Sequence, residues 1–251
     1  VLAWWALTPR AGDWLRPPRP GGFWSLVTGL GAGLSCRGSA TPCPPKPPHV
    51  GRWLSLFFLA CAAYFILWIP GDPPSCIGAL VKCLPILCLV ALLRAVRARV
   101  VLQGALLSSA VGDACLVWPA AFLYGVAAFT VAHLFYLWAF GLTPLQPGLL
   151  LPVVLVFVPY YGLLLPHLLP DMLLPLTAYV LVLAAMLWRG LARGGSAGWG
   201  SLLFTLSDAL LAWDTFAQPL PYARLAVMAT YYSAQVLIAL SGFRGPGLKT
   251  N

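Results

Sequence analysis

Apolar residues run with few interruptions from residue 52 to residue 243, in stretches separated by short breaks rich in proline, glycine or arginine. A transmembrane helix needs about 20 consecutive apolar residues, and clusters of Pro and Gly mark helix ends. The pattern therefore predicts an all-α, polytopic membrane protein with eight transmembrane helices. These are expected near residues 53–69, 75–93, 100–118, 120–140, 148–165, 171–188, 199–217 and 222–242.

The composition agrees with a membrane protein and narrows its partners. Apolar residues make up 61% of the chain and charged residues 8%, whereas soluble domains carry about 25% charged residues. The net charge of +9 does not indicate nucleic-acid binding, because the basic residues lie in short loops between apolar stretches. The seven cysteines form no C-x-x-C pair, so neither a disulfide framework nor a thiolate metal site is indicated.

Three regions follow from this pattern. Residues 1–51 are rich in Pro, Gly and Arg, and we expect a disordered or artefactual leader. Residues 52–243 form the eight-helix transmembrane domain, which carries the chemistry. Residues 244–251 form a short tail, which is expected to be cytosolic.

The basic residues predict the orientation of the helices. With eight spans, thirteen of the fifteen basic residues lie on the side of the termini, whereas Arg224 lies on the other side and Lys82 within a span. Cytosolic loops of membrane proteins are enriched in Lys and Arg, so both termini are expected to be cytosolic.

A weak internal repeat relates the two halves of the chain. The segments G-D-A-C-L-V-W (112–118) and S-D-A-L-L-A-W (207–213) align, and the same offset places Tyr136 on Tyr231. The first four spans then overlay the last four, which predicts a parallel 4+4 repeat about an axis along the membrane normal. Chance similarity between Leu- and Ala-rich helices is the alternative explanation.

Two aspartates, Asp113 and Asp208, lie within predicted spans on different helices. A charged side chain at the bilayer centre costs roughly 2.5–3.5 kcal/mol, and such residues face a bundle interior and mark functional sites. We therefore expect both carboxylates in one cavity. The other polar residues of the spans are Lys82, Ser109, His133, Tyr136, Thr205, Ser207, Asp214, Tyr231, Tyr232 and Gln235.

Several of these residues also have purely structural interpretations. Lys82 is suited to neutralising an aspartate as a buried ion pair, and His133 to a hydrogen bond with a main-chain carbonyl. The tyrosines are suited to helix packing. Asp214 lies near the predicted membrane interface, where water solvates it.

The residues of the predicted spans argue against two classes of hydrolase, those that use zinc and those that use a serine nucleophile. Of three histidines only His133 lies in a span, which is too few ligands for a zinc site, and no G-x-S-x-G motif is present. Two carboxyl groups remain, one expected to be protonated and one ionised, as in glycosidases that cleave through an oxocarbenium-like cation. An intramembrane aspartyl protease and a parallel-repeat transporter with a carboxylate ion site remain as alternatives.

Four stretches of the chain resemble the lysoplasmalogenase family of YhhN-type membrane proteins, over about residues 52–243. They read A-L-V-K-C-L-P (79–85), S-S-A-V-G-D-A-C-L-V-W-P-A-A-F (108–122), A-H-L-F-Y-L-W-A-F (132–140) and L-F-T-L-S-D-A-L-L-A-W-D-T-F-A-Q-P-L-P (203–221). Residues 1–51 do not match this pattern.

The resemblance implies an eight-span enzyme of the endoplasmic reticulum membrane that acts on a lysophospholipid. It would hydrolyse the vinyl ether bond of lysoplasmenyl-ethanolamine and lysoplasmenyl-choline to a fatty aldehyde and the glycerophospho-base, without a metal or organic cofactor. Asp113 and Asp208 would be the catalytic pair. The other family positions, expected to bind or support substrate, are Lys82, His133, Tyr136, Ser207, Tyr231 and Gln235.

The neighbours of each aspartate predict its role. Asp208 has hydroxyl and amide donors nearby, which favour the ionised form, whereas Asp113 has fewer. This reading assigns Asp113 as the general acid and Asp208 as the carboxylate that stabilises the cation and activates water. An ammonium group from Lys82 near Asp113 would stabilise the ionised form of that carboxyl group and so favour the reverse assignment.

Overall fold

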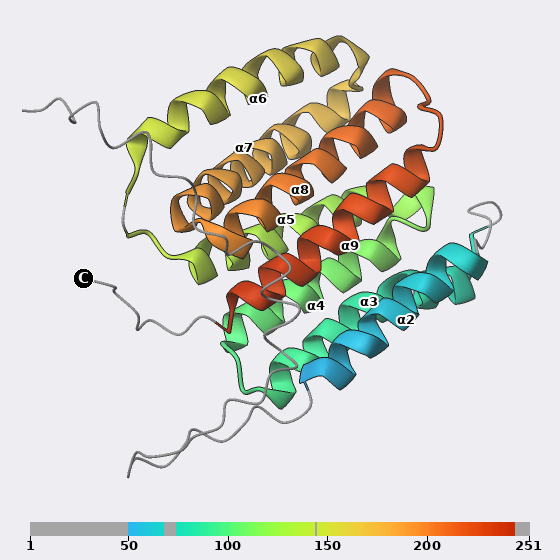
Figure 1. Ribbon diagram of the computed structural model, residues 1–251. Coiled ribbons are helices and arrows are strands. Elements are labelled where there is room, and N and C mark those ends of the chain that lie inside the picture. The colour runs from blue at the N-terminus through green and yellow to red at the C-terminus, as the bar shows by residue number, and fades with distance from the viewer. Residues whose placement is uncertain (1–49, 68–73, 144, 244–251) are drawn as a thin grey trace, which may run out of the picture. The chain divides into compact units, whose positions relative to one another are not determined.

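The computed structural model describes residues 50–67, 74–143 and 145–243, and these residues form eight α-helices and no strand (Figure 1). The short connections between the helices reverse the direction of the chain. The helices are α2 (Val50–Leu67), α3 (Cys76–Ala95), α4 (Val100–Cys115), α5 (Phe122–Phe140), α6 (Leu150–Leu164), α7 (Pro170–Arg193), α8 (Gly195–Ala212) and α9 (Ala223–Ser241).

Each stretch predicted to span the membrane corresponds to one helix, and the differences lie at the ends. The predicted leader and tail fall almost entirely on residues 1–49 and 244–251, outside the described residues, although Val50 and Gly51 already belong to α2. The third span is shorter than predicted, because α4 ends at Cys115 and a 3₁₀ turn, Pro119–Ala121, leads into α5. A π-helical turn, Trp213–Ala217, extends α8.

Six of the described helical segments are long and apolar enough to cross a membrane, which makes the chain a polytopic membrane protein. The two α-helices outside this set are α4 and α8. The first has 16 residues, and the second carries several polar residues, among them Thr205, Ser207 and Asp208. The two helices least typical of membrane spans are therefore those that carry the mid-span aspartates.

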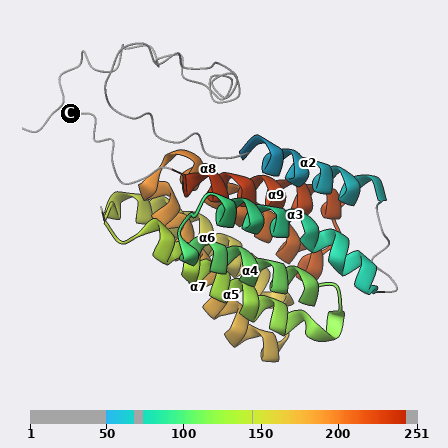
Figure 2. The same cartoon turned by 90° about the horizontal axis from the view of Figure 1, so that it is seen from below.

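Six helices form a closed cycle of neighbours, in the order α3, α4, α5, α7, α8, α9 and back to α3. Helix α2 packs on α3 outside this cycle, and α6 packs on α7 (Figures 1 and 2). All eight helices contribute residues to a single cavity described below.

Small residues bring the helices that carry the site close together. A Cβ atom at Gly190 of α7 would lie 1.8 Å from Ser201 Oγ on α8, and one at Gly200 would lie 2.7 Å from Ile238 Cγ1 on α9. On the other side of the bundle, a Cβ at Gly112 of α4 would overlap the ring of Phe129 on α5. Close approach through glycine is typical of membrane helix packing, and here it fixes α4, α8 and α9 against their neighbours.

Arginine side chains hold together the end of the bundle where α3, α5 and α7 finish. Arg189, which is fully buried, donates from Nε to the carbonyl of Gly141 at 2.8 Å, and Arg193 donates to the carbonyl of Phe140 at 3.1 Å. Arg99 reaches the carbonyl of Ala139 at 3.4 Å. Cations are favourable at a helix C-terminus, so these contacts stabilise the end of α5.

Candidate active site

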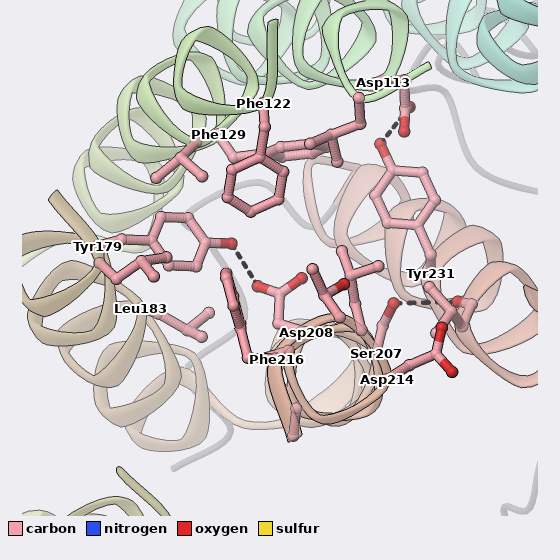
Figure 3. A pocket seen from close by; sticks show the side chains of 18 of the residues that line it. Asp113, Phe122, Phe129, Tyr179, Leu183, Ser207, Asp208, Asp214, Phe216 and Tyr231 are labelled. Atoms are coloured by element: carbon pink, nitrogen blue, oxygen red, sulfur yellow. Dashed lines mark hydrogen bonds between the residues drawn. The ribbon is translucent and has the colours of Figure 1, made fainter. Parts of the chain in front are cut away.

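The opposite end of the bundle contains a cavity of about 610 Å³. It is lined by the C-terminal parts of α2, α4, α6 and α8, by the first halves of α3, α5 and α9, and by residues 176–183 in the middle of α7. Asp113 and Asp208 both line it, as the sequence pattern predicts, and Figure 3 shows them on different helices facing the same space.

Asp113 of α4 is held by two groups from other helices. Its side chain is buried, and Oδ2 accepts a hydrogen bond of 2.6 Å from the hydroxyl of Tyr231 on α9 (Figure 3). The ammonium nitrogen of Lys82, on α3, lies 3.7 Å from Oδ1. Lys82 is thus the ion-pair partner of Asp113, in agreement with its structural interpretation, and it also lines the cavity.

Asp208 of α8 is held by a tyrosine that the sequence analysis did not select. Tyr179 of α7 donates a hydrogen bond of 2.5 Å to Oδ2 of Asp208 (Figure 3). His133 of α5 places Nε2 at 3.0 Å from the Tyr179 hydroxyl and at 3.6 Å from Asp208 Oδ2. With Tyr179 donating to the aspartate, its oxygen accepts from the Nε2–H of His133, so the three side chains form a continuous chain of hydrogen bonds.

His133 does not make the main-chain hydrogen bond of its structural interpretation. It is fully buried, its Nδ1 has no partner among the described residues, and its ring packs against Phe204 at a centroid distance of 4.7 Å. Its only polar contacts in the described chain run through Nε2 towards Tyr179 and Asp208.

The two aspartates have corresponding surroundings. Asp113 receives Lys82 from the preceding helix, α3, and Tyr231 from α9 in the other half of the chain. Asp208 receives Tyr179 from the preceding helix, α7, and His133 from α5 in the other half. When the first four helices are overlaid on the last four, α3 corresponds to α7 and α5 corresponds to α9. Equivalent helices therefore supply the partners of the two aspartates.

Three of the predicted site residues lie beside this cavity rather than on its wall, namely His133, Tyr136 and Gln235. Tyr136 is fully buried and donates to Gln235 Oε1 at 2.6 Å, and the Ser109 hydroxyl lies 3.4 Å from the Tyr136 hydroxyl. Tyr136 and Gln235 therefore form a buried hydrogen-bonded pair between α5 and α9, which places them in a supporting position.

The remaining predicted residues hold the main chain near the site. Ser207, on the cavity wall, donates to the carbonyl of Val227 at 3.0 Å and ties α8 to α9. The hydroxyl of Tyr232 donates to the carbonyl of Lys82 at 2.8 Å and ties α9 to α3. Asp214 also lines the cavity, and its Oδ1 accepts from the main-chain N–H of Leu220 at 2.8 Å.

The rest of the cavity wall is mostly apolar and aromatic. Phe122 and Phe216 meet edge to face with ring centroids 5.8 Å apart, and Phe129 lies beside them in Figure 3. Among the described residues, no three His, Cys, Asp or Glu side chains gather as metal ligands. Two carboxyl groups, each with a tyrosine donor, thus face an apolar space large enough for a lipid chain.

Comparison with known proteins identifies relatives of this chain. The model of the YhhN family matches residues 77–242. The chain is 72% identical over 207 residues to lysoplasmalogenase TMEM86B of Sus scrofa, covering 81% of this chain and 92% of that protein. It is 60% identical to lysoplasmalogenase TMEM86B of Homo sapiens, covering 88% of this chain and all of that protein, and 40% identical to lysoplasmalogenase TMEM86A of Bos taurus, covering 76% and 88%. No solved structure matches the fold.

Proposed function

Because this chain belongs to the YhhN family, and similar members are lysoplasmalogenases, we propose that it hydrolyses the vinyl ether bond of lysoplasmalogens in the cavity described above. The products are a fatty aldehyde and a glycerophospho-base, either glycerophosphoethanolamine or glycerophosphocholine. The observation that carries this proposal is the pair Asp113 and Asp208, which line one apolar cavity and each accept a hydrogen bond from a tyrosine.

The reaction begins with protonation of carbon. A carboxylic acid adds a proton to the outer vinyl carbon, which is the one not bonded to oxygen. The positive charge that forms is shared between the ether oxygen and the inner vinyl carbon, to which that oxygen is bonded. A buried carboxyl group positioned against the substrate is a suitable general acid. A nearby carboxylate stabilises the cation, because opposite charges attract strongly in a site that excludes water.

The contacts of the two aspartates support one assignment of these roles. The Lys82 ammonium beside Asp113 stabilises negative charge on that carboxylate, whereas the closest polar groups around Asp208 are Tyr179 and His133. This ion pair supports the reverse of the sequence-based assignment. Asp208 acts as the general acid, and Asp113 acts as the carboxylate that stabilises the cation and activates water.

Tyr179 determines which oxygen of Asp208 carries the transferred proton. Its hydroxyl donates to Oδ2, so the proton is carried by Oδ1, which points into the cavity in Figure 3. After Asp208 has lost the proton, the same hydrogen bond stabilises the carboxylate. Tyr179 and His133 are therefore positioning residues for the acid.

The second half of the reaction consumes one water molecule. Asp113 accepts a proton from this water while the water oxygen bonds to the inner carbon, which gives a hemiacetal. The bond between the hemiacetal carbon and the glycerol oxygen then breaks. The glycerol oxygen takes the proton held by Asp113 and leaves as the alcohol, while the hemiacetal hydroxyl gives its proton to Asp208 and becomes the carbonyl of the aldehyde. The net change is hydrolysis of the ether bond by one water molecule, which returns both carboxyl groups to their starting states without a change of redox state.

Release of aldehyde from a defined substrate tests the proposal. The full chain, purified in detergent, is expected to release a fatty aldehyde from lysoplasmenyl-ethanolamine but not from the saturated alkyl ether of the same headgroup, which has no double bond to protonate. No aldehyde from the vinyl ether, in protein that elutes as a single folded species, would refute the function.

We also propose that all eight helices span the endoplasmic reticulum membrane with both termini in the cytosol. Arg52, Arg94, Arg97, Arg99, Arg189 and Arg193 lie at one end of the described bundle. Arg224 is the basic residue at the other end within the described part of the chain. The positive-inside rule then places the cavity in the lumenal half of the bundle. A glycosylation acceptor inserted between α6 and α7 is expected to be modified and one between α3 and α4 is not, and the opposite pattern would reverse the orientation.

The parallel 4+4 repeat is part of this proposal. Its support is the contact pattern, because replacing α2, α3, α4 and α5 by α6, α7, α8 and α9 reproduces the same neighbours: α3 with α4, α4 with α5, and α3 with α9. The matching surroundings of Asp113 and Asp208 support it at the level of side chains. A repeat of this kind gives each half of the site one carboxyl group.

A further inference from the structure

Three charged side chains line the cavity besides Asp113 and Asp208, and none of the three comes from α6 or α7. Lys82 comes from α3, Arg224 from the first turn of α9, and Asp214 from the π-helical turn after α8. The wall formed by α6 and α7 contributes apolar and aromatic side chains to the same cavity. The cavity thus has a charged side and an apolar side, as an amphipathic ligand requires.

We propose that Arg224, together with Lys82, binds the phosphate of a zwitterionic single-chain lipid, and that the hydrocarbon chain lies against α6 and α7. This inference rests on the proposed function and specifies how its substrate is held. It makes Arg224 a residue that determines specificity for a phosphorylated headgroup, a role that the sequence analysis did not give it.

Arg224 is fixed in its position by Tyr64 of α2. Its Nε donates to the Tyr64 hydroxyl at 3.1 Å, and its guanidinium carbon lies 5.4 Å from the centroid of the Tyr64 ring. Tyr64 is buried, so it holds the arginine at the cavity wall. A guanidinium group presents several N–H donors in a planar fork that matches the oxygens of a phosphate, which suits Arg224 to this ligand.

The position of Arg224 along α9 fits the length of the substrate. Arg224 and Tyr231 are seven residues apart, which is about two helical turns, so they lie on the same face and about 10 Å apart along the axis. Tyr231 holds Asp113, where the reaction is proposed to occur. In a lysoplasmalogen the glycerol backbone separates the vinyl ether from the phosphate, so a phosphate near Arg224 places the vinyl ether near the aspartates.

Lys82 contributes both to the phosphate position near Arg224 and to the surroundings of Asp113. Its ammonium group is 3.7 Å from Asp113 Oδ1, an ion pair rather than a close hydrogen bond, and it remains part of the cavity wall. An ammonium group has three donors, so Lys82 is able to contact Asp113 and a phosphate oxygen at the same time. It therefore joins the phosphate position to the catalytic carboxylate.

Asp214 supplies the opposite charge at the same end. Its Oδ1 accepts from Leu220 N–H in the loop before α9, and Asp214 lines the cavity as Arg224 does. A carboxylate at this position attracts the ammonium or trimethylammonium group of an ethanolamine or choline headgroup, and it repels a second negative charge. The pair Arg224 and Asp214 thus matches a zwitterion better than a phosphate monoester.

The apolar side of the cavity matches the hydrocarbon chain. This part of the wall is lined by Val156, Phe157 and Leu164 of α6 and by Leu176 and Leu183 of α7. Ligand sites of this kind have volumes of roughly 300–1,000 Å³, and the 610 Å³ of this cavity lies within that range. One chain and one headgroup therefore occupy the two sides of a single site.

Binding of unreactive ligands tests the inference separately from catalysis. The ligands are 1-O-alkyl-glycerophosphoethanolamine, which keeps the headgroup, and 1-O-alkylglycerol, which lacks the phosphate. Both are saturated ethers, so their dissociation constants from the purified full chain are measurable even if the protein released no aldehyde. The wild-type protein is expected to bind the phosphorylated ether more tightly.

The variant Arg224→Gln is expected to weaken binding of the phosphorylated ether by about 10- to 100-fold, the range for a lost charge-assisted hydrogen bond. Binding of 1-O-alkylglycerol should not change, and this also shows that the variant is folded. Arg224→Lys keeps the charge, so its affinity for the phosphorylated ether should lie between those of the wild-type protein and Arg224→Gln. Arg94→Gln, on the exposed last turn of α3 at the other end of the bundle, is the matched control and should leave both constants unchanged.

Three results would overturn the inference. The first is a wild-type protein that binds the two ethers equally, and the second is an Arg224→Gln variant that still prefers the phosphorylated one. The third is an equal loss of affinity for both ethers in Arg224→Gln and Arg224→Lys, which would mean that Arg224 only supports the fold. Absence of aldehyde release from the vinyl ether would refute the proposed function and leave these binding results as they stand.

Discussion

Tyr231 of α9 donates a hydrogen bond of 2.6 Å to Asp113 of α4, although the two residues are 118 positions apart in the chain. The bond joins the second half of the protein to the carboxylate of the first half. His133 of α5 and Asp208 of α8 make the reciprocal contact, at 3.6 Å. Neither half therefore contains a complete site, and packing of the two halves against each other creates it.

The first prediction concerns both carboxyl groups. Asp113→Asn and Asp208→Asn are each expected to lower kcat by at least about 100- to 10,000-fold, the usual contribution of a positioned acid or base. An amide keeps the volume but neither transfers the acid proton nor carries negative charge. Aldehyde release measured on protein of normal elution volume checks this. Asp171→Asn, in the first turn of α7, is the control and should keep full activity. Asp214→Asn should be milder than either catalytic variant.

The second prediction concerns Tyr179. Tyr179→Phe removes the hydrogen bond to Asp208 Oδ2 and leaves the ring in place, so kcat should fall by about tenfold or more while KM changes little. His133→Phe should have a smaller effect, because its hydrogen bond is to Tyr179 and its Nε2 lies farther from Asp208 Oδ2, at 3.6 Å. The double variant Tyr179→Phe/His133→Phe should have a kcat only slightly below that of Tyr179→Phe alone. Additive losses in the double variant would show that the two residues act separately.

Tyr124→Phe is a suitable control for this series, since Tyr124 is exposed on α5 and lines no part of the cavity. Its kinetic constants should match those of the wild-type enzyme. A loss in Tyr179→Phe that appears entirely in KM would instead assign Tyr179 to substrate binding.

The sequence predicted the helices well because a membrane span is a local property. About 20 apolar residues followed by Pro or Gly specify each helix without knowledge of its neighbours. The shared cavity of Asp113 and Asp208 was predictable for a similar reason, since a mid-span carboxylate has to face the bundle interior. The helix ends differ where a tertiary contact or a turn decides them, as at Cys115.

Side-chain partners were less predictable because they depend on how each helix is rotated about its axis. Tyr179 carries no sequence signal beyond being a tyrosine within a span, and tyrosines in spans commonly serve in packing. Its contact with Asp208 arises from the packing of α7 on α8. Likewise, the roles of Lys82 and Asp113 depend on the distance between them, and the sequence of either helix alone does not predict that distance.

The third prediction concerns the ion pair of Lys82 and Asp113. Removing Asp113 alone leaves an ammonium group in the bundle without its carboxylate, which is costly in a region of low dielectric constant. Asp113→Asn should therefore lower the thermal unfolding temperature, and the double variant Lys82→Met/Asp113→Asn should recover most of the loss. Both variants have strongly reduced activity, so thermal unfolding in detergent is the readout. A double variant less stable than Asp113→Asn would show that Lys82 stabilises the fold through other contacts.

The last prediction separates the roles of the two aspartates. A general acid acts only when protonated, so its titration causes the fall in activity at high pH, and a base acts only when ionised, so its titration causes the fall at low pH. If Asp208 is the acid, the residual activity of Asp208→Asn should no longer fall at high pH, whereas Asp113→Asn should lose the fall at low pH. The sequence-based assignment, with Asp113 as the acid, predicts the reverse. Single-turnover aldehyde release with enzyme in excess makes both residual rates measurable. A residual activity of Asp208→Asn that still falls at high pH with the wild-type midpoint would exclude Asp208 as the acid, and with it the proposed role of Tyr179 in orienting the proton.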